Sequence, residues 1–128
     1  MSEVRIIVGD RGERHYLVDG GAIATEGDDQ VARMAWIAMQ IPLGASVAWI
    51  GGGFCIGPRL SMGRKQTVYE IEPALREFCP EGVEFVPGDW RDTISGKYDV
   101  IVFDLGGDVP RETLAKYLNP GGVLLPKE

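Results

Sequence analysis

Glycines and carboxylates stand in this sequence at positions where they could hold a nucleoside-type ligand. Gly51, Gly52 and Gly53 follow the apolar run 47–50. Glycines let a backbone turn approach a ligand closely, and the N-terminus of a following helix offers free N–H groups. A glycine-rich turn between a strand and a helix is a weak signal by itself, so its interpretation depends on the acidic residues that follow.

Each of those acidic residues stands near the expected end of a later strand. Glu70 follows Gly51 by 19 residues, the spacing at which a carboxylate accepts hydrogen bonds from a ribose diol. Asp89 could accept a hydrogen bond from an adenine amino group while the neighbouring Trp90 covers the ring. Asp104 is a candidate base or amine-binding group. The alternatives are structural: a surface glutamate, a Gly-Asp turn and a loop cap.

The elements that must position these residues alternate between strands and short helices. We expect strands over 47–50, 67–71, 83–86, 98–105 and 121–126, and helices over 58–62, 73–78 and 110–117. This alternation predicts an α/β, Rossmann-like fold with a parallel sheet in the order 3-2-1-4-5. In such a sheet ligands bind beyond the carboxyl ends of the strands, beside the first strand. The glycines and the carboxylates would meet there.

A different pattern precedes this core. Residues 4–8 and 15–18 flank a turn-forming segment and predict a β-hairpin, and AIAT after it could form a further strand. Asp28 and Asp29 suit the start of a helix whose buried face carries Val31, Met34, Ile37, Ala38 and Ile41. We expect one domain over 1–128, with an N-terminal hairpin region (1–27) and a Rossmann-like core (28–128).

Composition and charge narrow the class of partner. A chain of 128 residues suits one hydrophobic core, and its net charge of −6 argues against a nucleic-acid partner. No apolar run approaches the roughly 20 residues of a membrane span. Cys55, Cys79 and the single His15 lack metal-ligand spacing, so we expect no metal site. A small-molecule ligand and a reduced, cytoplasmic setting are the resulting expectations.

Taken together, a glycine turn and acids after three strands are the layout of S-adenosylmethionine-type sites. A nicotinamide fingerprint fits less well, because a G-x-G-x-x-G motif read from Gly51 and Gly53 would need glycine where Ile56 stands. We therefore expect S-adenosylmethionine or its decarboxylated form as the cofactor.

Several segments, in order, resemble the spermidine synthases, which have the class I methyltransferase-like fold. The segments are YLVDGGAIATEGDD, VAWIGGG, YEIEP, VEFVPGDWRD and KYDVIVFDLGGDVP. The resemblance implies that Glu70 binds ribose and that Asp89 lies near adenine. Ile71, next to Glu70, is a further candidate cofactor-binding residue. It implies that Asp104 faces the reacting amine, which in the family displaces methylthioadenosine from decarboxylated S-adenosylmethionine. Asp108 would replace the family's second aspartate, although its spacing is one residue longer.

The departures from the family fall on the reacting end of the site. Phe54 stands where the family has an aspartate, and Cys55 and Ile56 replace its next glycines. Ile23 replaces a cofactor-binding glutamine, and residues 32–34 replace the family's Tyr-His-Glu. An apolar side chain in place of the aspartate would leave a cationic amine unpaired. Aminopropyl transfer is therefore not expected.

The sequence ends with the fifth expected strand, so we expect a sheet without the last two strands of the full methyltransferase fold. Pro126 and Lys127 could blunt the resulting edge, or the edge could pair with a second subunit in a homodimer. Three functions remain open. They are a small transferase with an unknown acceptor, an inactive binding or structural homologue that acts through self-association, and, by fold analogy alone, a nicotinamide-binding module.

Overall fold

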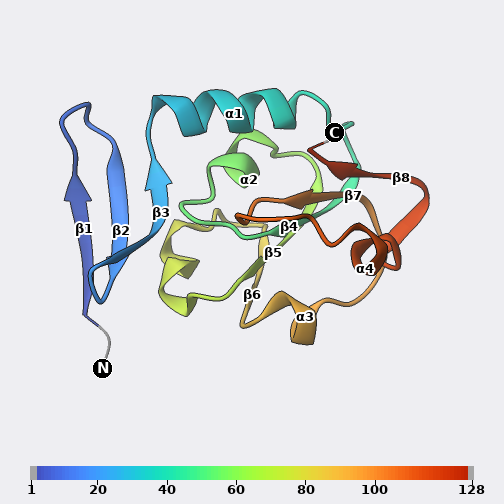
Figure 1. Ribbon diagram of the computed structural model, residues 1–128. Helices are drawn as coiled ribbons and strands as arrows, with labels where there is room; N and C mark the ends of the chain where they lie inside the picture. The colour runs from blue at the N-terminus through green and yellow to red at the C-terminus, as the bar shows by residue number, and fades with distance from the viewer. Residues whose placement is uncertain (1–2, 127–128) are drawn as a thin grey trace.

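The computed structural model describes residues 3–126, which form two β-sheets and the helices that cover one of them (Figure 1). The first sheet is antiparallel, in the order β1-β2-β3, and the second has five strands, in the order β6-β5-β4-β7-β8. The strands of the second sheet are β4 (Ser46–Ile50), β5 (Lys65–Glu70), β6 (Glu84–Pro87), β7 (Tyr98–Phe103) and β8 (Leu118–Leu125). Every neighbouring pair among them is parallel. The predicted order 3-2-1-4-5 is confirmed.

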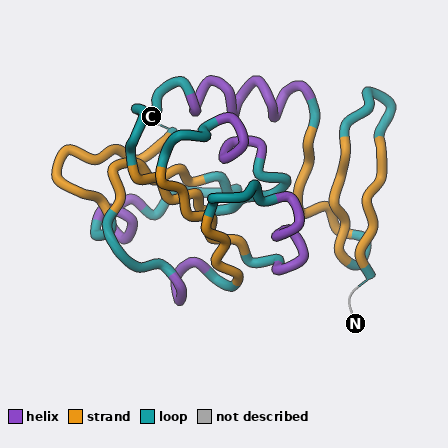
Figure 2. The backbone as a smooth tube through the Cα atoms, turned by 180° about the vertical axis from the view of Figure 1, so that it is seen from behind, coloured by secondary structure: helices purple, strands orange, loops and turns teal. Residues whose placement is uncertain are grey.

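The N-terminal sheet contains the predicted hairpin and a third strand. β1 (Val4–Val8) pairs with β2 (Arg14–Val18), and β2 pairs with β3 (Gly21–Glu26). Figures 1 and 2 show the β1–β2 hairpin at one end of the molecule, beyond β3. All five residues of β1 are exposed, whereas Tyr16 of β2 is buried in the same hydrophobic cluster as Trp49 of β4. The two sheets therefore share one core.

The centre of the parallel sheet is β4, whose alternate side chains enter two different cores. Val47 and Trp49 belong to the cluster beneath α1 (Asp28–Ala38), whereas Ala48 and Ile50 belong to the cluster around Trp90. A strand covered on both faces is expected to be apolar throughout, as this run is. Figure 1 shows α1 and α2 (Ile56–Leu60) on one side of the sheet, and α3 (Trp90–Thr93) and α4 (Arg111–Ala115) on the other.

The parallel register brings the ends of the three central strands together. Ile50 at the end of β4 is level with Tyr69 on β5 and with Phe103 on β7. The residues that follow these strands therefore lie at one edge of the sheet. Glu70 is the last residue of β5, and Asp104 comes directly after β7, one residue beyond its end.

The structure differs from the sequence-based expectations in several elements. The segment 73–78 is a 3-10 helix, η1 (Pro73–Phe78), and α3 was not expected. The Asp89 side chain starts α3 by accepting a hydrogen bond from the backbone N–H of Arg91. β8 begins at Leu118, three residues before the expected start of the last strand at Gly121. Val31 was wrongly placed on the buried face of α1, because its side chain is exposed.

No helix within residues 3–126 is long and apolar enough to cross a membrane.

Lys127 lies outside the described residues, and the homodimer stays a prediction. β8 is the edge strand on its side of the parallel sheet, as expected for the fifth strand.

Gly57 in α2 gives a test of this packing. A Cβ at this position would lie 2.4 Å from Cζ3 of Trp49, which is itself fixed because its Nε1–H donates to Oε1 of Gln66 at 2.7 Å. Overpacking a core costs about 1–3 kcal/mol, more than the roughly 1 kcal/mol that alanine gains over glycine in a helix. We expect Gly57→Ala to lower the free energy of unfolding in urea.

Gly106→Ala is the matched control, because no atom lies within 4 Å of its added Cβ and its φ is not positive. Its effect should stay within about 0.5 kcal/mol. Equal midpoints for the two variants would contradict the packing described around Trp49.

Candidate functional site

The glycine turn after β4 is shaped by its neighbours as much as by its own flexibility. Gly51 has a φ of +89°, and its N–H donates to the carbonyl of Tyr69 at 2.9 Å. A Cβ on Gly51 would lie 2.7 Å from Cδ2 of Leu105, and a Cβ on Gly52 would lie 2.5 Å from Cγ1 of Val68. Glycine is therefore required at both positions by conformation or packing, before any ligand is considered.

The Glu70 carboxylate holds this turn in place. Its Oε1 accepts hydrogen bonds from the backbone N–H groups of Gly52 (3.1 Å) and Gly53 (3.0 Å), and its Oε2 accepts one from Glu72 (2.9 Å). Only 7% of the residue is exposed. A carboxylate has about four acceptor sites, so one acceptor site is left after these three bonds. The predicted ribose-binding carboxylate is thus also the brace of the glycine turn.

The Glu70 carboxylate forms part of the wall of two cavities. The larger has a volume of about 340 Å³ and lies between β3, α1 and the glycine turn. The smaller has a volume of about 100 Å³ and lies beyond the ends of β5 and β6. Gly51, Glu70 and Leu105 line both. The cavities therefore adjoin through shared walls.

Nearly all of the predicted site residues line one of these cavities. The larger contains Gly51, Gly52, Gly53 and Asp104, and the smaller contains Ile71, Asp89 and Trp90. Asp108 lines neither, because the loop after Asp104 carries it to an exposed position. The structure does not bring Asp108 together with the other residues, and its catalytic role stays a prediction.

Asp89 and Trp90 have structural partners in the smaller cavity. Oδ1 of Asp89 accepts from the N–H of Arg91 at 2.9 Å and lies 3.6 Å from its guanidinium Nη1. The Trp90 ring is buried and packs edge-on against Phe103, with ring centroids 6.4 Å apart. Ile71, by contrast, is 68% exposed, so it presents a free apolar surface.

Asp104 forms an ion pair that sequence reasoning missed. Nη1 of Arg33, on α1, lies 2.5 Å from Oδ1 of Asp104. Burial raises the pKa of the Asp104 carboxyl, and the Arg33 guanidinium opposes this shift. Arg33 is 71 positions away in the sequence, and no local pattern connects it to Asp104. The aspartate expected to face an amine therefore already has a cationic partner.

Other cavity residues that the sequence did not single out are Thr25, Gln30 and Leu105. Thr25 and Gln30 come from β3 and α1, and a polar residue on the inner side of an amphipathic helix is a signal that could have identified Gln30. The position of Leu105 depends on its contact with the glycine turn, which no local pattern indicates.

Phe54 lies at the wall of the larger cavity but belongs to the core. It is 1% exposed, and its ring packs edge-on against Tyr16 and Phe78, with centroids 6.1 and 4.7 Å away. The guanidinium carbon of Arg14 lies 4.9 Å from the centroid of the Phe54 ring. The position at which the family has a ligand-binding aspartate is a packing position in this chain.

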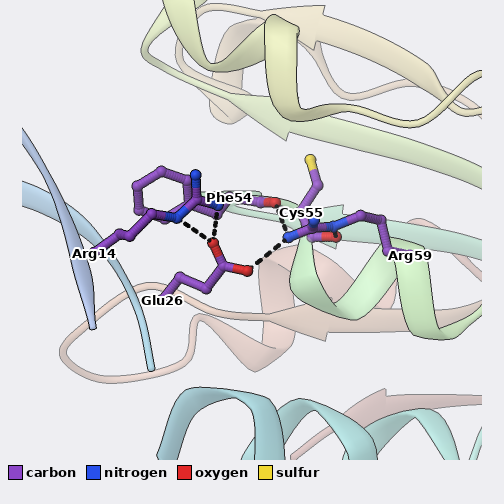
Figure 3. Close-up of polar contacts among 5 residues, drawn as sticks. All are labelled: Arg14, Glu26, Phe54, Cys55 and Arg59. Carbon is purple, nitrogen blue, oxygen red and sulfur yellow. Dashed lines mark hydrogen bonds and ion pairs between the residues drawn. The ribbon is translucent and has the colours of Figure 1, made fainter. Parts of the chain in front are cut away.

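Glu26, at the end of β3, connects the segment around Phe54 to the N-terminal sheet (Figure 3). Its carboxylate binds the guanidinium groups of Arg14 and Arg59. Arg59 also donates to the carbonyls of Phe54 (2.9 Å) and Cys55 (3.2 Å). A continuous set of charge-assisted hydrogen bonds thus links β2 and β3 to the start of α2.

Cys55 is a structural residue. It adopts a positive φ of 57°, and its side chain is fully buried. Burial raises the pKa of the Cys55 thiol to about 12, and burial also raises the pKa of Cys79. The start of α2 therefore does not lower the pKa of this thiol. Within residues 3–126 no three His, Cys, Asp or Glu side chains are arranged to hold a metal ion.

Comparison with known proteins relates the fold to solved structures only. No family model matches the sequence, and no curated protein matches it either. A tRNA m1G37 methyltransferase from M. jannaschii has a TM-score of 0.69 and 15% identity over 94% of this chain and 42% of its own. Methanocaldococcus jannaschii Trm5 in complex with adenosine has a TM-score of 0.67 and 18% identity over 97% and 42%.

An S-adenosylmethionine-dependent methyltransferase from Thiobacillus denitrificans, in complex with S-adenosyl-L-homocysteine, has a TM-score of 0.57 and 21% identity over 77% of this chain and 47% of its own. The chain spans less than half the length of these proteins. The fold of the chain is class I methyltransferase-like. Because one of these proteins acts on tRNA, the absence of a nucleic-acid partner stays a prediction.

The brace at Glu70 can be tested with Glu70→Gln. The glutamine amide has one acceptor oxygen, whereas the carboxylate has two. Its NH₂ group would therefore face a backbone N–H that in the unchanged protein donates to a carboxylate oxygen. Leaving a buried donor unpaired costs about 1–3 kcal/mol, so the urea midpoint should fall. Glu84→Gln, at an exposed position on β6, is the control and should leave the midpoint nearly unchanged. A Glu70→Gln variant as stable as this control would contradict the brace.

The raised pKa of Cys55 predicts slow thiol chemistry. In a Cys79→Ser background at pH 8, about four units below that pKa, iodoacetamide should leave Cys55 almost unmodified in the folded protein. The same variant in 6 M guanidinium, where roughly the ordinary thiol pKa of about 8.5 applies, is the control and should react fully. Mass spectrometry measures both, and rapid labelling of the folded protein would contradict a buried thiol.

Proposed function

We propose that this chain binds an S-adenosyl ligand, S-adenosylmethionine or its decarboxylated form, across the two adjoining cavities. The observation that carries the proposal is the wall they share, formed by Gly51, Glu70 and Leu105. In this arrangement adenine occupies the smaller cavity, the ribose lies at Glu70, and the sulfur-linked chain extends into the larger cavity. The combined volume is in the range of small-molecule sites, about 300–1,000 Å³.

The smaller cavity has the chemistry that an adenine ring requires. Ile71 offers an apolar surface for one face of the ring, and the Asp89 carboxylate, of which Oδ1 binds Arg91, has a second oxygen for an exocyclic amino group. At the shared wall, Glu70 has acceptor capacity left for a ribose hydroxyl after its three backbone bonds. Structural neighbours in complex with adenosine and with S-adenosyl-L-homocysteine support this class of ligand.

Kinship with the spermidine synthases is part of the proposal, but aminopropyl transfer is not. The antiparallel strands before the parallel sheet and the acids at the strand ends support the kinship. Phe54 is buried where the family has its aspartate, and Asp104 is paired with Arg33. A bound S-adenosylmethionine would supply a sulfonium-activated alkyl group, and we propose a transferase with an acceptor other than a polyamine.

Ligand binding is tested by isothermal titration and thermal shift with S-adenosylmethionine, its decarboxylated form, methylthioadenosine, S-adenosylhomocysteine and NAD. A ligand at 100 times its Kd should stabilise the fold by about 2.7 kcal/mol, which raises the Tm by several degrees. We expect this with the adenosyl ligands and not with NAD. No shift with any adenosyl ligand would contradict the proposal, and a shift with NAD alone would establish the nicotinamide alternative.

Ile71→Ala tests the location of adenine. Removing this surface should weaken methylthioadenosine binding about fivefold, because roughly 1 kcal/mol of apolar contact is lost. Leu43→Ala, which removes an exposed side chain away from both cavities, is the matched control and should bind as the unchanged protein does. Equal affinities for the two variants would place adenine elsewhere.

A further inference from the structure

The larger cavity contains an ion pair at a position where a ligand chain would end. Arg33 and Asp104 line this cavity and not the smaller one, whereas Ile71 and Asp89 line only the smaller one. Their polar atoms are 2.5 Å apart. The side chains are 49% and 28% exposed, so the pair is open to a ligand.

The charged groups that line this cavity are one guanidinium and two carboxylates. Its charged lining residues, within the described chain, are Arg33, Asp104 and Glu70. Glu70 already accepts three backbone hydrogen bonds, and Asp104 is neutralised by Arg33. A ligand that ends in a lone ammonium group would find Asp104 already paired with Arg33 and Glu70 already bonded to three backbone N–H groups. A ligand that ends in both an ammonium and a carboxylate would find a partner of opposite charge for each.

Both members of the pair have hydrogen-bonding capacity left. A guanidinium carries five N–H donors and a carboxylate has two oxygens, whereas the bond between Arg33 and Asp104 uses one of each. Among residues 3–126 neither side chain makes a further hydrogen bond. Guanidinium groups bind carboxylates in a two-bond arrangement. Arg33 can therefore bind a carboxylate while Asp104 accepts from the neighbouring ammonium.

We propose, on the basis of the function proposed above, that Arg33 and Asp104 form the receptor for the α-amino acid end of the ligand. The cavity then selects S-adenosyl ligands that keep their carboxylate, S-adenosylmethionine and S-adenosylhomocysteine, over decarboxylated S-adenosylmethionine. Asp104 acts as a cofactor-binding residue, in contrast to the amine-facing role that the resemblance implies.

Titration of the whole chain with three adenosyl ligands separates the contact to the ligand carboxylate from the contact to the ligand amine. Decarboxylated S-adenosylmethionine differs from S-adenosylmethionine by the carboxylate, and methylthioadenosine lacks the amine as well. We expect S-adenosylmethionine to bind at least about tenfold more tightly than the decarboxylated form, because a hydrogen bond to a charged group is lost with the carboxylate. Equal or tighter binding of the decarboxylated form would overturn the inference.

The Arg33→Met variant should change the affinities for the two amine-bearing ligands in opposite directions. Without the arginine, Asp104 is unpaired, so affinity for decarboxylated S-adenosylmethionine should rise while affinity for S-adenosylmethionine falls, and the preference reverses. Asp104→Asn should weaken both amine-bearing ligands. Methylthioadenosine should bind all variants equally, which also shows that they are folded. Arg5→Met removes an exposed arginine outside the cavity and is the matched control.

The possible failures are distinguishable. If Arg33→Met weakens all three ligands by the same factor, the ion pair has a structural role only and the inference is wrong. If the unchanged protein binds none of them, including methylthioadenosine, the proposed function itself is wrong and the inference fails with it.

Discussion

The carboxylate of Glu70 is the contact on which the site depends. It joins the end of β5 to the turn after β4 through the N–H groups of Gly52 and Gly53, and it fixes the next turn through Glu72. These bonds hold the two strand ends together at the sheet edge where the cavities meet. Because both cavities use Glu70 as a wall, their relative position follows from this one buried side chain.

The same carboxylate determines the electrostatics of the larger cavity. Since Glu70 spends three of its acceptor sites on backbone donors, the charged side chains that face the rest of this cavity are Arg33 and Asp104. Burial disfavours the charged form of Asp104, and the guanidinium beside it favours that form. The ion pair thus explains how a carboxylate can persist at the mouth of the sheet.

The sequence predicts the parallel sheet well because its signals are local. The uninterrupted apolar run of β4, the glycines after it and the strand-helix alternation indicate the order and the edge at which Glu70 and Asp104 meet. It could not predict the partner of Asp104, because Arg33 lies on a helix 71 positions earlier. Some contacts depend on how a helix is rotated above a sheet, or on where Leu105 packs. No local pattern in the sequence predicts such contacts.

Phe54, which stands where the spermidine synthases have an aspartate, links the site to the N-terminal sheet. An aspartate at this position could reach a ligand, whereas the phenylalanine packs on Tyr16 of β2 and lies beneath the guanidinium of Arg14. Glu26 binds that arginine and also Arg59, which holds the carbonyl of Phe54. Residues 22–25 of β3 line the larger cavity, so the contacts that fasten this sheet also set the shape of the cavity. In this chain the side chain at position 54 contributes packing to the wall of the cavity.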